Sequence, residues 1–208
     1  MEEKGLKIIL IGESGVGKTN LINVLFGNEF DENINTTYNS YFFEGKYKLN
    51  GKVYHYNIWD TAGQEQYRAL NKLFIKESKI VICVYAIDNR QSFEEIDFWV
   101  NYVKEILGEK GYILGLCANK SDLFETQEVQ DEEGKKLAQK YNLKFNVTSA
   151  LYNIKGFRAF LYELIKDYLG LKDAVIEEIE NDNPQSNNTS FKVNRKKFKA
   201  EVKKGCYL

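Results

Sequence analysis

The sequence predicts an α/β fold built around a mostly parallel sheet. One observation is a set of short apolar runs separated by segments with helical spacing, which is typical of strands joined by crossover helices. These runs are residues 6–11, 80–87, 112–118 and 144–147. A second observation is that two more strand-like runs flank Asn50-Gly51, the dipeptide that best tolerates a two-residue hairpin turn. A third is a glycine-rich run between the first strand and the first helix, which is typical of a P-loop NTPase.

The hairpin arms are residues 41–49 and 53–59, and they should add one antiparallel pair to the sheet. Apolar and polar residues alternate in the second arm, so we expect His55 to point to solvent. Five helices should cover the sheet, and Ser92 and Asp131 are the expected capping residues of two of them. The predicted helices are residues 18–26, 66–76, 92–107, 131–141 and 155–169.

Composition and charge limit the classes of function. The 208 residues suit one domain with an appendage, because domains commonly hold about 100–150 residues. The charges of the 29 basic and 30 acidic residues nearly cancel, so no overall electrostatic field favours binding to nucleic acid. We also expect a monomer. Cys83 and Cys117 lie in apolar runs, as expected for reduced cysteines in the cytoplasm. We expect neither a signal peptide nor a membrane-spanning segment.

The C-terminal residues, 172–208, should form a largely disordered tail to a domain of residues 1–171. Polar and like-charged runs bury too little apolar surface to fold. A basic stretch at residues 192–204 precedes Cys206, which is third from the end. Prenylation of Cys206 together with this stretch would attach the chain to an anionic membrane. A C-a-a-X box needs the cysteine fourth from the end, so an unmodified cysteine is the alternative.

The glycine-rich run, residues 12–19, fits the phosphate-binding spacing G-x-x-x-x-G-K-[ST]. A strand before it and a helix after it aim backbone N–H groups and the positive end of the helix dipole at one point. Four loop residues are therefore expected to contact a polyphosphate: Ser14, Gly15, Val16 and Gly17. Lys18 would lie over the outer phosphates, and the Thr19 hydroxyl would supply an oxygen to Mg²⁺.

A second motif, Asp60-Thr61-Ala62-Gly63-Gln64, directly follows the second hairpin arm. Asp60 can hold Mg²⁺ through water, and Gly63 lets its backbone N–H approach a γ-phosphate. The Gln64 amide can orient an attacking water, because phosphoryl transfer needs positioning more than a strong base.

Two motifs after later strands predict which base is bound. In Asn119-Lys120-Ser121-Asp122, the carboxylate can accept two hydrogen bonds from guanine, whereas adenine offers no such pair of donors. Asn119 opens this motif, and Lys120 would lay its aliphatic stem along the base. The backbone of Ser149 and Ala150 would offer an N–H to the guanine carbonyl. A P-loop kinase or ATPase is the alternative, and Asp122 argues against it.

With these motifs in this order and spacing, residues 5–170 resemble the small GTPases, and the Rab family among them. The resemblance implies a six-stranded sheet with one antiparallel edge hairpin and five flanking helices, which binds GTP or GDP with Mg²⁺. It implies that Thr37 reaches Mg²⁺ only when a γ-phosphate is present, and that Phe30 packs against guanine. Gln64, Lys18 and Thr37 form the expected catalytic set.

Finer marks favour the Rab family. Phe42, Trp59 and Phe74 are similar to the aromatic triad that links the two switches of Rab proteins, and ordinary core packing is the alternative interpretation. The resemblance implies a slow GTPase that recruits effectors in its GTP state, in vesicle trafficking, with an exchange factor and a GTPase-activating protein as partners. It would cycle between the cytoplasm and the cytoplasmic face of an intracellular membrane. A Ras- or Rho-type signalling GTPase and a nucleotide-locked scaffold that does not hydrolyse GTP remain alternatives.

Three departures from the family pattern affect these expectations. Tyr38-Asn39 replaces Ile-Gly after the switch threonine, and residues 74–78 replace a Tyr-Tyr-Arg-Gly-Ala run, so the resemblance does not identify the effectors or the exchange factor. Leu151 replaces a lysine near the base, which should slightly loosen nucleotide binding.

Overall fold

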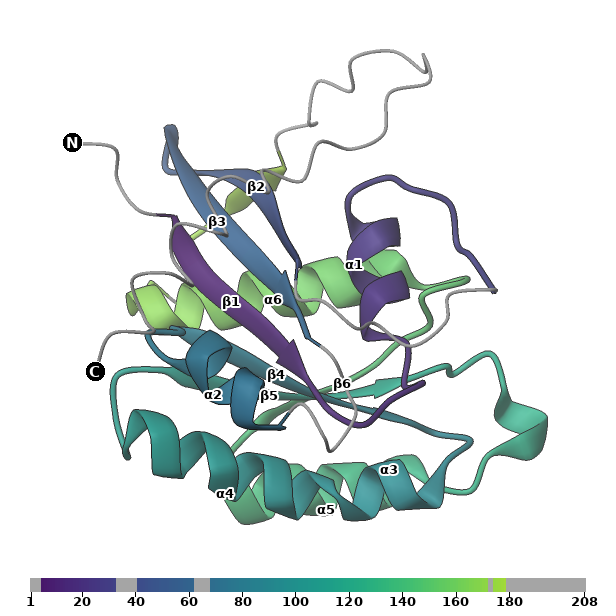
Figure 1. The fold of residues 1–208 in the computed structure, drawn as a ribbon. Helices are drawn as coiled ribbons and strands as arrows, with labels where there is room; N and C mark the ends of the chain where they lie inside the picture. Colours follow the sequence, from purple (N-terminus) through teal and green to yellow (C-terminus); the bar gives the residue numbers. More distant parts are fainter. Residues whose placement is uncertain (1–4, 33–40, 62–67, 172–173, 179–208) are drawn as a thin grey trace.

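The computed structural model describes residues 5–32, 41–61, 68–171 and 174–178. Within these ranges, one seven-stranded sheet runs through the molecule in the order β6-β5-β4-β1-β3-β2-β7 (Figure 1). The strands are β1 (Leu6–Ile11), β2 (Tyr41–Leu49), β3 (Lys52–Asp60), β4 (Ile80–Ala86), β5 (Ile113–Asn119), β6 (Lys144–Val147) and β7 (Ile176–Glu178). Central β1 pairs in parallel with both β3 and β4, and parallel pairing continues through β5 to β6.

Helices cover both faces of this sheet. They are α1 (Lys18–Leu25), α2 (Arg68–Ile75), α3 (Arg90–Glu94), α4 (Ile96–Leu107), α5 (Asp131–Tyr141) and α6 (Ile154–Leu169), with a short 3₁₀ helix, η2 (Phe124–Thr126). One apolar cluster joins α1 and α6 to the sheet, and a second joins α2, α4 and α5 to the opposite face (Figure 1). In the described part of the chain, no helix has the length and apolar character needed to cross a membrane.

The predicted fold class is confirmed, including the six expected strands and the antiparallel hairpin. The hairpin closes with Leu49 opposite Lys52. Both turn residues, Asn50 and Gly51, have positive φ, at 50° and 79°, as a two-residue turn with the right twist requires. All seven residues of β4 are buried, as expected for a parallel strand with helices on both faces.

The predicted helix over residues 92–107 is in fact two helices, α3 and α4, and Ser92 is not its cap. The Asn89 side chain caps α3, because its oxygen accepts a hydrogen bond from the Ser92 N–H at 2.9 Å. The Ser92 hydroxyl instead accepts from the Ala86 N–H at the end of β4. Asn and Ser are both strong capping residues, so the sequence alone could not rank them.

The start of α5 differs from the prediction in the same way. Asp131 is the first helical residue, and the position before it, Gln130, is the cap. The backbone N–H of Gln130 donates to the Glu133 carboxylate at 3.0 Å, so the helix start is held by a residue three positions on.

The segment predicted to be a largely disordered tail includes one short strand. Residues 176–178 form β7, which pairs antiparallel with the outer edge of β2 and places Ile176 opposite Leu49. Ala174 and Ile176 pack against the same apolar cluster as α1 and α6. The strand is only three residues long and lies in an acidic run, and its pairing depends on an edge that exists only in the folded sheet.

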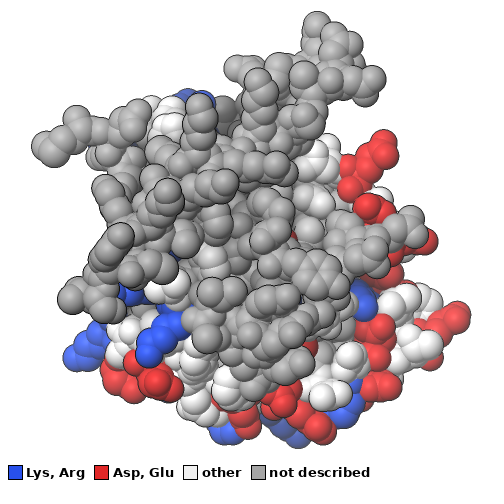
Figure 2. Space-filling model, in the orientation of Figure 1, with Lys and Arg blue, Asp and Glu red and all other residues white. Residues whose placement is uncertain are grey.

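The arrangement puts the predicted motifs together. The loops after β1, β3, β5 and β6 all leave from the carboxyl ends of parallel strands, and such ends meet at one edge of a sheet. In Figure 2, acidic and basic side chains mix along the lower part of the described surface.

Candidate nucleotide-binding site

The glycine-rich loop between β1 and α1 has the backbone of an anion cradle. Gly12, Gly15 and Gly17 have φ values of 141°, 78° and 91°, a region that side chains with a Cβ rarely adopt. At Gly12 a Cβ would come within 2.1 Å of the Val84 carbonyl oxygen, so the loop passes tightly over β4. Turns of this kind point successive N–H groups into one concave space.

Lys18 lies at the start of α1, beneath this loop, and only 5% of its surface is exposed. Its ammonium donates to the carbonyl oxygens of Gly12 at 2.9 Å and Glu13 at 2.7 Å. Burial lowers the pKa of Lys18 to about 8, although the carboxylates of Asp60 and Glu13 act in the opposite direction. A dehydrated cation beside such a loop fits a polyanionic ligand, whose charge would offset the cost of burial.

The two described residues that were predicted to bind the metal are in contact. Thr19 follows Lys18 on α1, and its hydroxyl donates to the Asp60 carboxylate at 2.9 Å. Asp60 is the last residue of β3 and is 1% exposed. A hydroxyl and a carboxylate beside a phosphate cradle are the oxygen donors that Mg²⁺ prefers, because it is commonly held by one or two carboxylates together with substrate phosphates. The residues present therefore fit Mg²⁺.

The motif after β5 is tied to the phosphate loop. The Asn119 side chain donates to the Val16 carbonyl at 2.8 Å, across 103 positions of sequence. The next residue, Lys120, has a φ of 64°, and its ammonium lies 3.7 Å from the Asp88 carboxylate. Asp88 belongs to none of the sequence motifs, although its place just beyond β4 puts it at the same sheet edge.

Asp122, the predicted selector of guanine, is held by Ser149. The Ser149 hydroxyl donates to the Asp122 carboxylate and accepts from the N–H groups of Leu151 and Tyr152, each at 3.1 Å. Ser149 and Ala150 are buried after β6. From the sequence, only a backbone role was expected for Ser149, because a Thr-Ser-Ala tripeptide carries little information until its contact with Asp122 is known.

Phe30 lies in the segment that follows α1 and is partly buried against the apolar cluster shared with α6. Two hydrogen bonds between Asn20 and Asp31 hold this segment beside α1. Four other predicted site residues lie outside the residues that the structure describes: Thr37, Gly63, Gln64 and Cys206.

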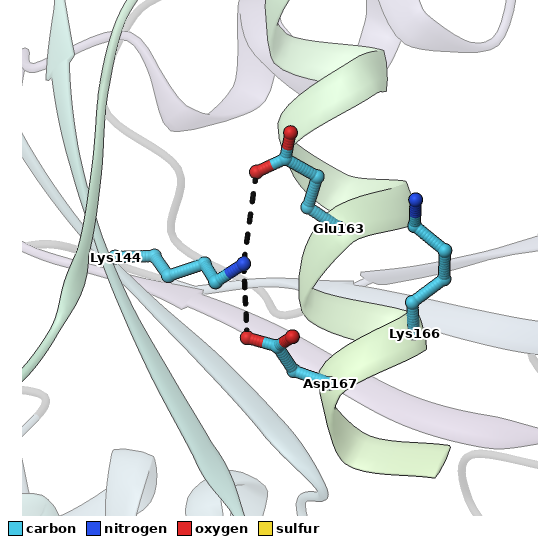
Figure 3. A pocket seen from close by; sticks show the side chains of 4 residues that line it. All are labelled: Lys144, Glu163, Lys166 and Asp167. Carbon is cyan, nitrogen blue, oxygen red and sulfur yellow. Dashed lines mark ion pairs between the residues drawn. The ribbon is translucent and has the colours of Figure 1, made fainter. Parts of the chain in front are cut away.

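A separate surface hollow lies between β6 and α6, where Lys144 forms ion pairs with Glu163 and Asp167 at 3.8 and 3.1 Å (Figure 3). Lys144 is the first residue of β6, so the hollow is at the opposite end of the strands from the predicted motifs. Two lysines and two carboxylates line the hollow, so it has no net positive charge and does not fit a polyphosphate.

In the predicted aromatic triad, Trp59 contacts both of the other rings. The Phe42 and Trp59 rings lie 5.0 Å apart, and the Trp59 and Phe74 rings lie 5.7 Å apart. The triad thus joins β2, β3 and α2.

Comparison with known proteins identifies the family. The model of the Ras family matches residues 7–169. The chain is 38% identical over 161 residues to the Ras-related protein RABA2b of Arabidopsis thaliana, covering 76% of this chain and 75% of that protein. It is 34% identical over 189 residues to the Ras-related protein Rab-8A of Bos taurus, covering 90% and 88%. The chain belongs to the Rab family of small GTPases.

As a Rab GTPase, this protein is a switch that binds guanine nucleotide and hydrolyses GTP to GDP. A longer match includes part of the tail, since the Ras-related protein RIC2 of Oryza sativa subsp. japonica is 33% identical over 199 residues, covering 96% of this chain and 91% of that protein. Family membership also implies exchange factors, GTPase-activating proteins and effectors as general classes of partner.

Proposed function

We propose that this Rab GTPase binds GTP with Mg²⁺ at the edge formed by the loops after β1, β3, β5 and β6, and that its GTP form recruits effectors in vesicle trafficking. The observation that carries the proposal is Lys18, a buried ammonium with carbonyl partners under a loop of positive-φ glycines. Such a site stabilises an anion far better than the same groups would in water.

The phosphate loop residues have separate roles in this proposal. The N–H groups from Ser14 to Thr19 bind the phosphates, with Gly15 and Gly17 allowing the close approach. Lys18 adds its charge to the outer phosphates as hydrolysis shifts negative charge toward the leaving oxygen.

Thr19 and Asp60 would hold Mg²⁺, and Thr37 would join them in the GTP form. When bound there, Mg²⁺ would neutralise negative charge on the phosphates. Thr19→Asn removes the hydroxyl that donates to Asp60 at 2.9 Å, so we expect weaker binding of GTP than of GDP, measured by displacement of a fluorescent analogue.

Base selection rests on Asp122, positioned by Ser149 and supported by Lys120, Asn119, Ala150 and Phe30. The site would reject adenine because the Asp122 carboxylate would lose both donors, a loss that can reach about 10⁴-fold. Competition between ATP and bound GDP tests this directly. Displacement of GDP by ATP at equal concentration would show that the proposed base site is wrong.

Hydrolysis would depend on Gln64 to orient the attacking water and on the Gly63 N–H to hold the γ-phosphate. We expect slow turnover without a partner, because related GTPases gain about 10⁵-fold when a GTPase-activating protein donates an arginine. Gln64→Leu should keep nucleotide affinity and stall single-turnover hydrolysis. An unchanged rate in this variant would remove Gln64 from the mechanism, and no turnover of the parent protein with an activating partner would favour a nucleotide-locked scaffold.

Effector recruitment is tested by comparing two forms of the protein. Gln64→Leu should accumulate the GTP form, and Thr19→Asn should accumulate the GDP or empty form. Proteins captured by the first and not by the second are effectors, and membrane-transport proteins among them would support the vesicle-trafficking role. Equal capture by both forms would argue against a nucleotide-dependent output.

The tail is proposed to carry the membrane attachment. Prenylation of Cys206 would act with the basic stretch at residues 192–204, because one lipid chain alone binds membranes weakly and nearby basic side chains add about 1 kcal/mol each. The protein would then cycle between the cytoplasm and the cytoplasmic face of an intracellular membrane. Intact-mass measurement of the native protein tests this, and the mass of an unmodified chain would exclude a lipid anchor.

A further inference from the structure

A hydrogen bond joins the hydrophobic core to the phosphate loop at a residue outside the nucleotide contacts discussed so far. Trp99 lies on α4 and is fully buried. Its indole Nε1–H donates to the Glu13 carboxylate at 3.1 Å, linking residues 86 positions apart. Glu13 is the second residue of the glycine-rich loop, between Gly12 and Ser14.

The indole ring is fixed on its other sides by packing. It lies edge-on to the rings of Phe98 and Tyr102, with centroid separations of 5.3 and 6.2 Å. The ring belongs to the apolar cluster between the sheet and α4. A side chain held in this way presents its single N–H in one direction, so the position of its acceptor is restricted too.

The Glu13 contact leads directly to the catalytic lysine. The main-chain carbonyl of Glu13 accepts from the Lys18 ammonium at 2.7 Å, while its carboxylate accepts from Trp99. One residue thus connects a rigid ring in the core to the charge expected to contact the outer phosphates. The loop glycines on either side have wide conformational freedom, so a side-chain tether has more effect here than it would in a helix.

We propose that Trp99 is a positioning residue for nucleotide binding: its indole N–H fixes Glu13, and the Glu13 carbonyl fixes Lys18 under the phosphate loop. This inference rests on the proposed nucleotide site. A loop without the tether samples more conformations, and only part of them present Lys18 and the loop N–H groups together. The apparent affinity for nucleotide falls in proportion to the fraction of conformations that can bind.

The experiment compares release of a fluorescent GDP analogue, with Mg²⁺ present, from the full chain and its variants. Trp99→Phe keeps an aromatic ring and deletes the donor, and Glu13→Leu deletes the acceptor. Loss of a hydrogen bond to a charged group typically changes an equilibrium constant about tenfold. We therefore expect each variant to release the analogue about tenfold faster than the parent protein. Because both remove the same bond, the double variant should be no faster than either single variant.

Two controls separate positioning from simple loss of stability. Glu13→Gln retains an oxygen acceptor for Trp99, so it should release the analogue more slowly than Glu13→Leu does. Val103→Ala, at a fully buried position of the same helix, should lower the melting temperature without changing release. In proton–nitrogen NMR spectra, the Trp99 indole signal should shift in Glu13→Leu and stay near its place in Glu13→Gln.

The outcomes are distinguishable from failure of the nucleotide site itself. A parent protein that binds guanine nucleotide, with unchanged release in Trp99→Phe, would overturn the positioning role and leave the site intact. Effects that multiply in the double variant would also overturn it, because the two residues would then act independently. A parent protein that binds no guanine nucleotide would overturn both proposals.

Discussion

Gly17 offers a quantitative test of how the phosphate loop is held. It is the N-cap of α1 with φ at 91°, and a Cβ built on it would lie 2.5 Å from the Asn119 side-chain nitrogen. That nitrogen donates to the Val16 carbonyl at 2.8 Å. Gly17→Ala therefore adds a backbone cost and also pushes away a hydrogen-bonding partner from a buried carbonyl.

The two costs can be estimated separately. A non-glycine residue in the left-handed region costs about 1–2 kcal/mol, and leaving a buried acceptor unpaired costs about 1–3 kcal/mol. Gly17→Ala should thus lower the free energy of unfolding by about 2–5 kcal/mol. Gly15→Ala is the matched control, because Gly15 has φ at 78° and a Cβ there would meet nothing within 4 Å. It should cost only about 1–2 kcal/mol.

Urea denaturation followed by circular dichroism, at one fixed concentration of GDP and Mg²⁺, measures both variants. In an Asn119→Ala background the contact is already gone, so Gly17→Ala should cost no more than Gly15→Ala does. Equal destabilisation by Gly17→Ala and Gly15→Ala in the parent chain would refute the reasoning. A Gly17→Ala cost that stays large without the Asn119 side chain would refute it as well.

Two further predictions concern the edge strand and an ion pair. Ile176→Ala should weaken the packing of β7 by about 1 kcal/mol, as expected for a half-buried branched side chain, and should speed amide exchange in residues 47–49. The control Val175→Ala, at a position 72% exposed, should leave this exchange unchanged. Equal exchange in both variants would mean that β7 does not depend on Ile176. The Arg90 guanidinium, through its hydrogen bond, lowers the pKa of Glu133 from 4.5 to about 2. This carboxylate therefore contributes stability that is fully present above about pH 4.5 and is lost as the pH falls through about 2. Melting curves from pH 5 to about 2 should therefore show less loss of stability in Glu133→Gln than in the parent chain, and identical acid profiles would exclude this pair as a source of acid sensitivity.

The sequence was sufficient to predict that its motifs meet at one edge of the sheet. Residues 12–19 and Asn119–Asp122 have short motifs whose chemistry depends on residue type and spacing, and both follow strands of strong apolar character. Parallel strands place their carboxyl ends together, so the meeting of these motifs at one edge could be expected before any contact was known.

Contacts between distant residues could not be predicted in this way. Asn89 rather than Ser92 caps α3, because the Ser92 hydroxyl bonds with the end of β4. The strand at Ile176, within a segment predicted to be largely disordered, could not be expected, because its partners are an open strand edge and an apolar cluster that form only on folding. Local propensity carries no information about either partner.

The sequence by itself determined the chemistry of this protein: a lysine and a threonine after a glycine-rich loop, an aspartate after the hairpin, and an aspartate after the fifth strand. The tertiary structure decided how those groups are held. Trp99 reaches Glu13 and Ser149 reaches Asp122 through contacts between elements far apart in the chain. A hydrogen bond of this kind forms only when the donor–acceptor distance is correct to within a few tenths of an ångström and the direction is right. Only the packed core sets both.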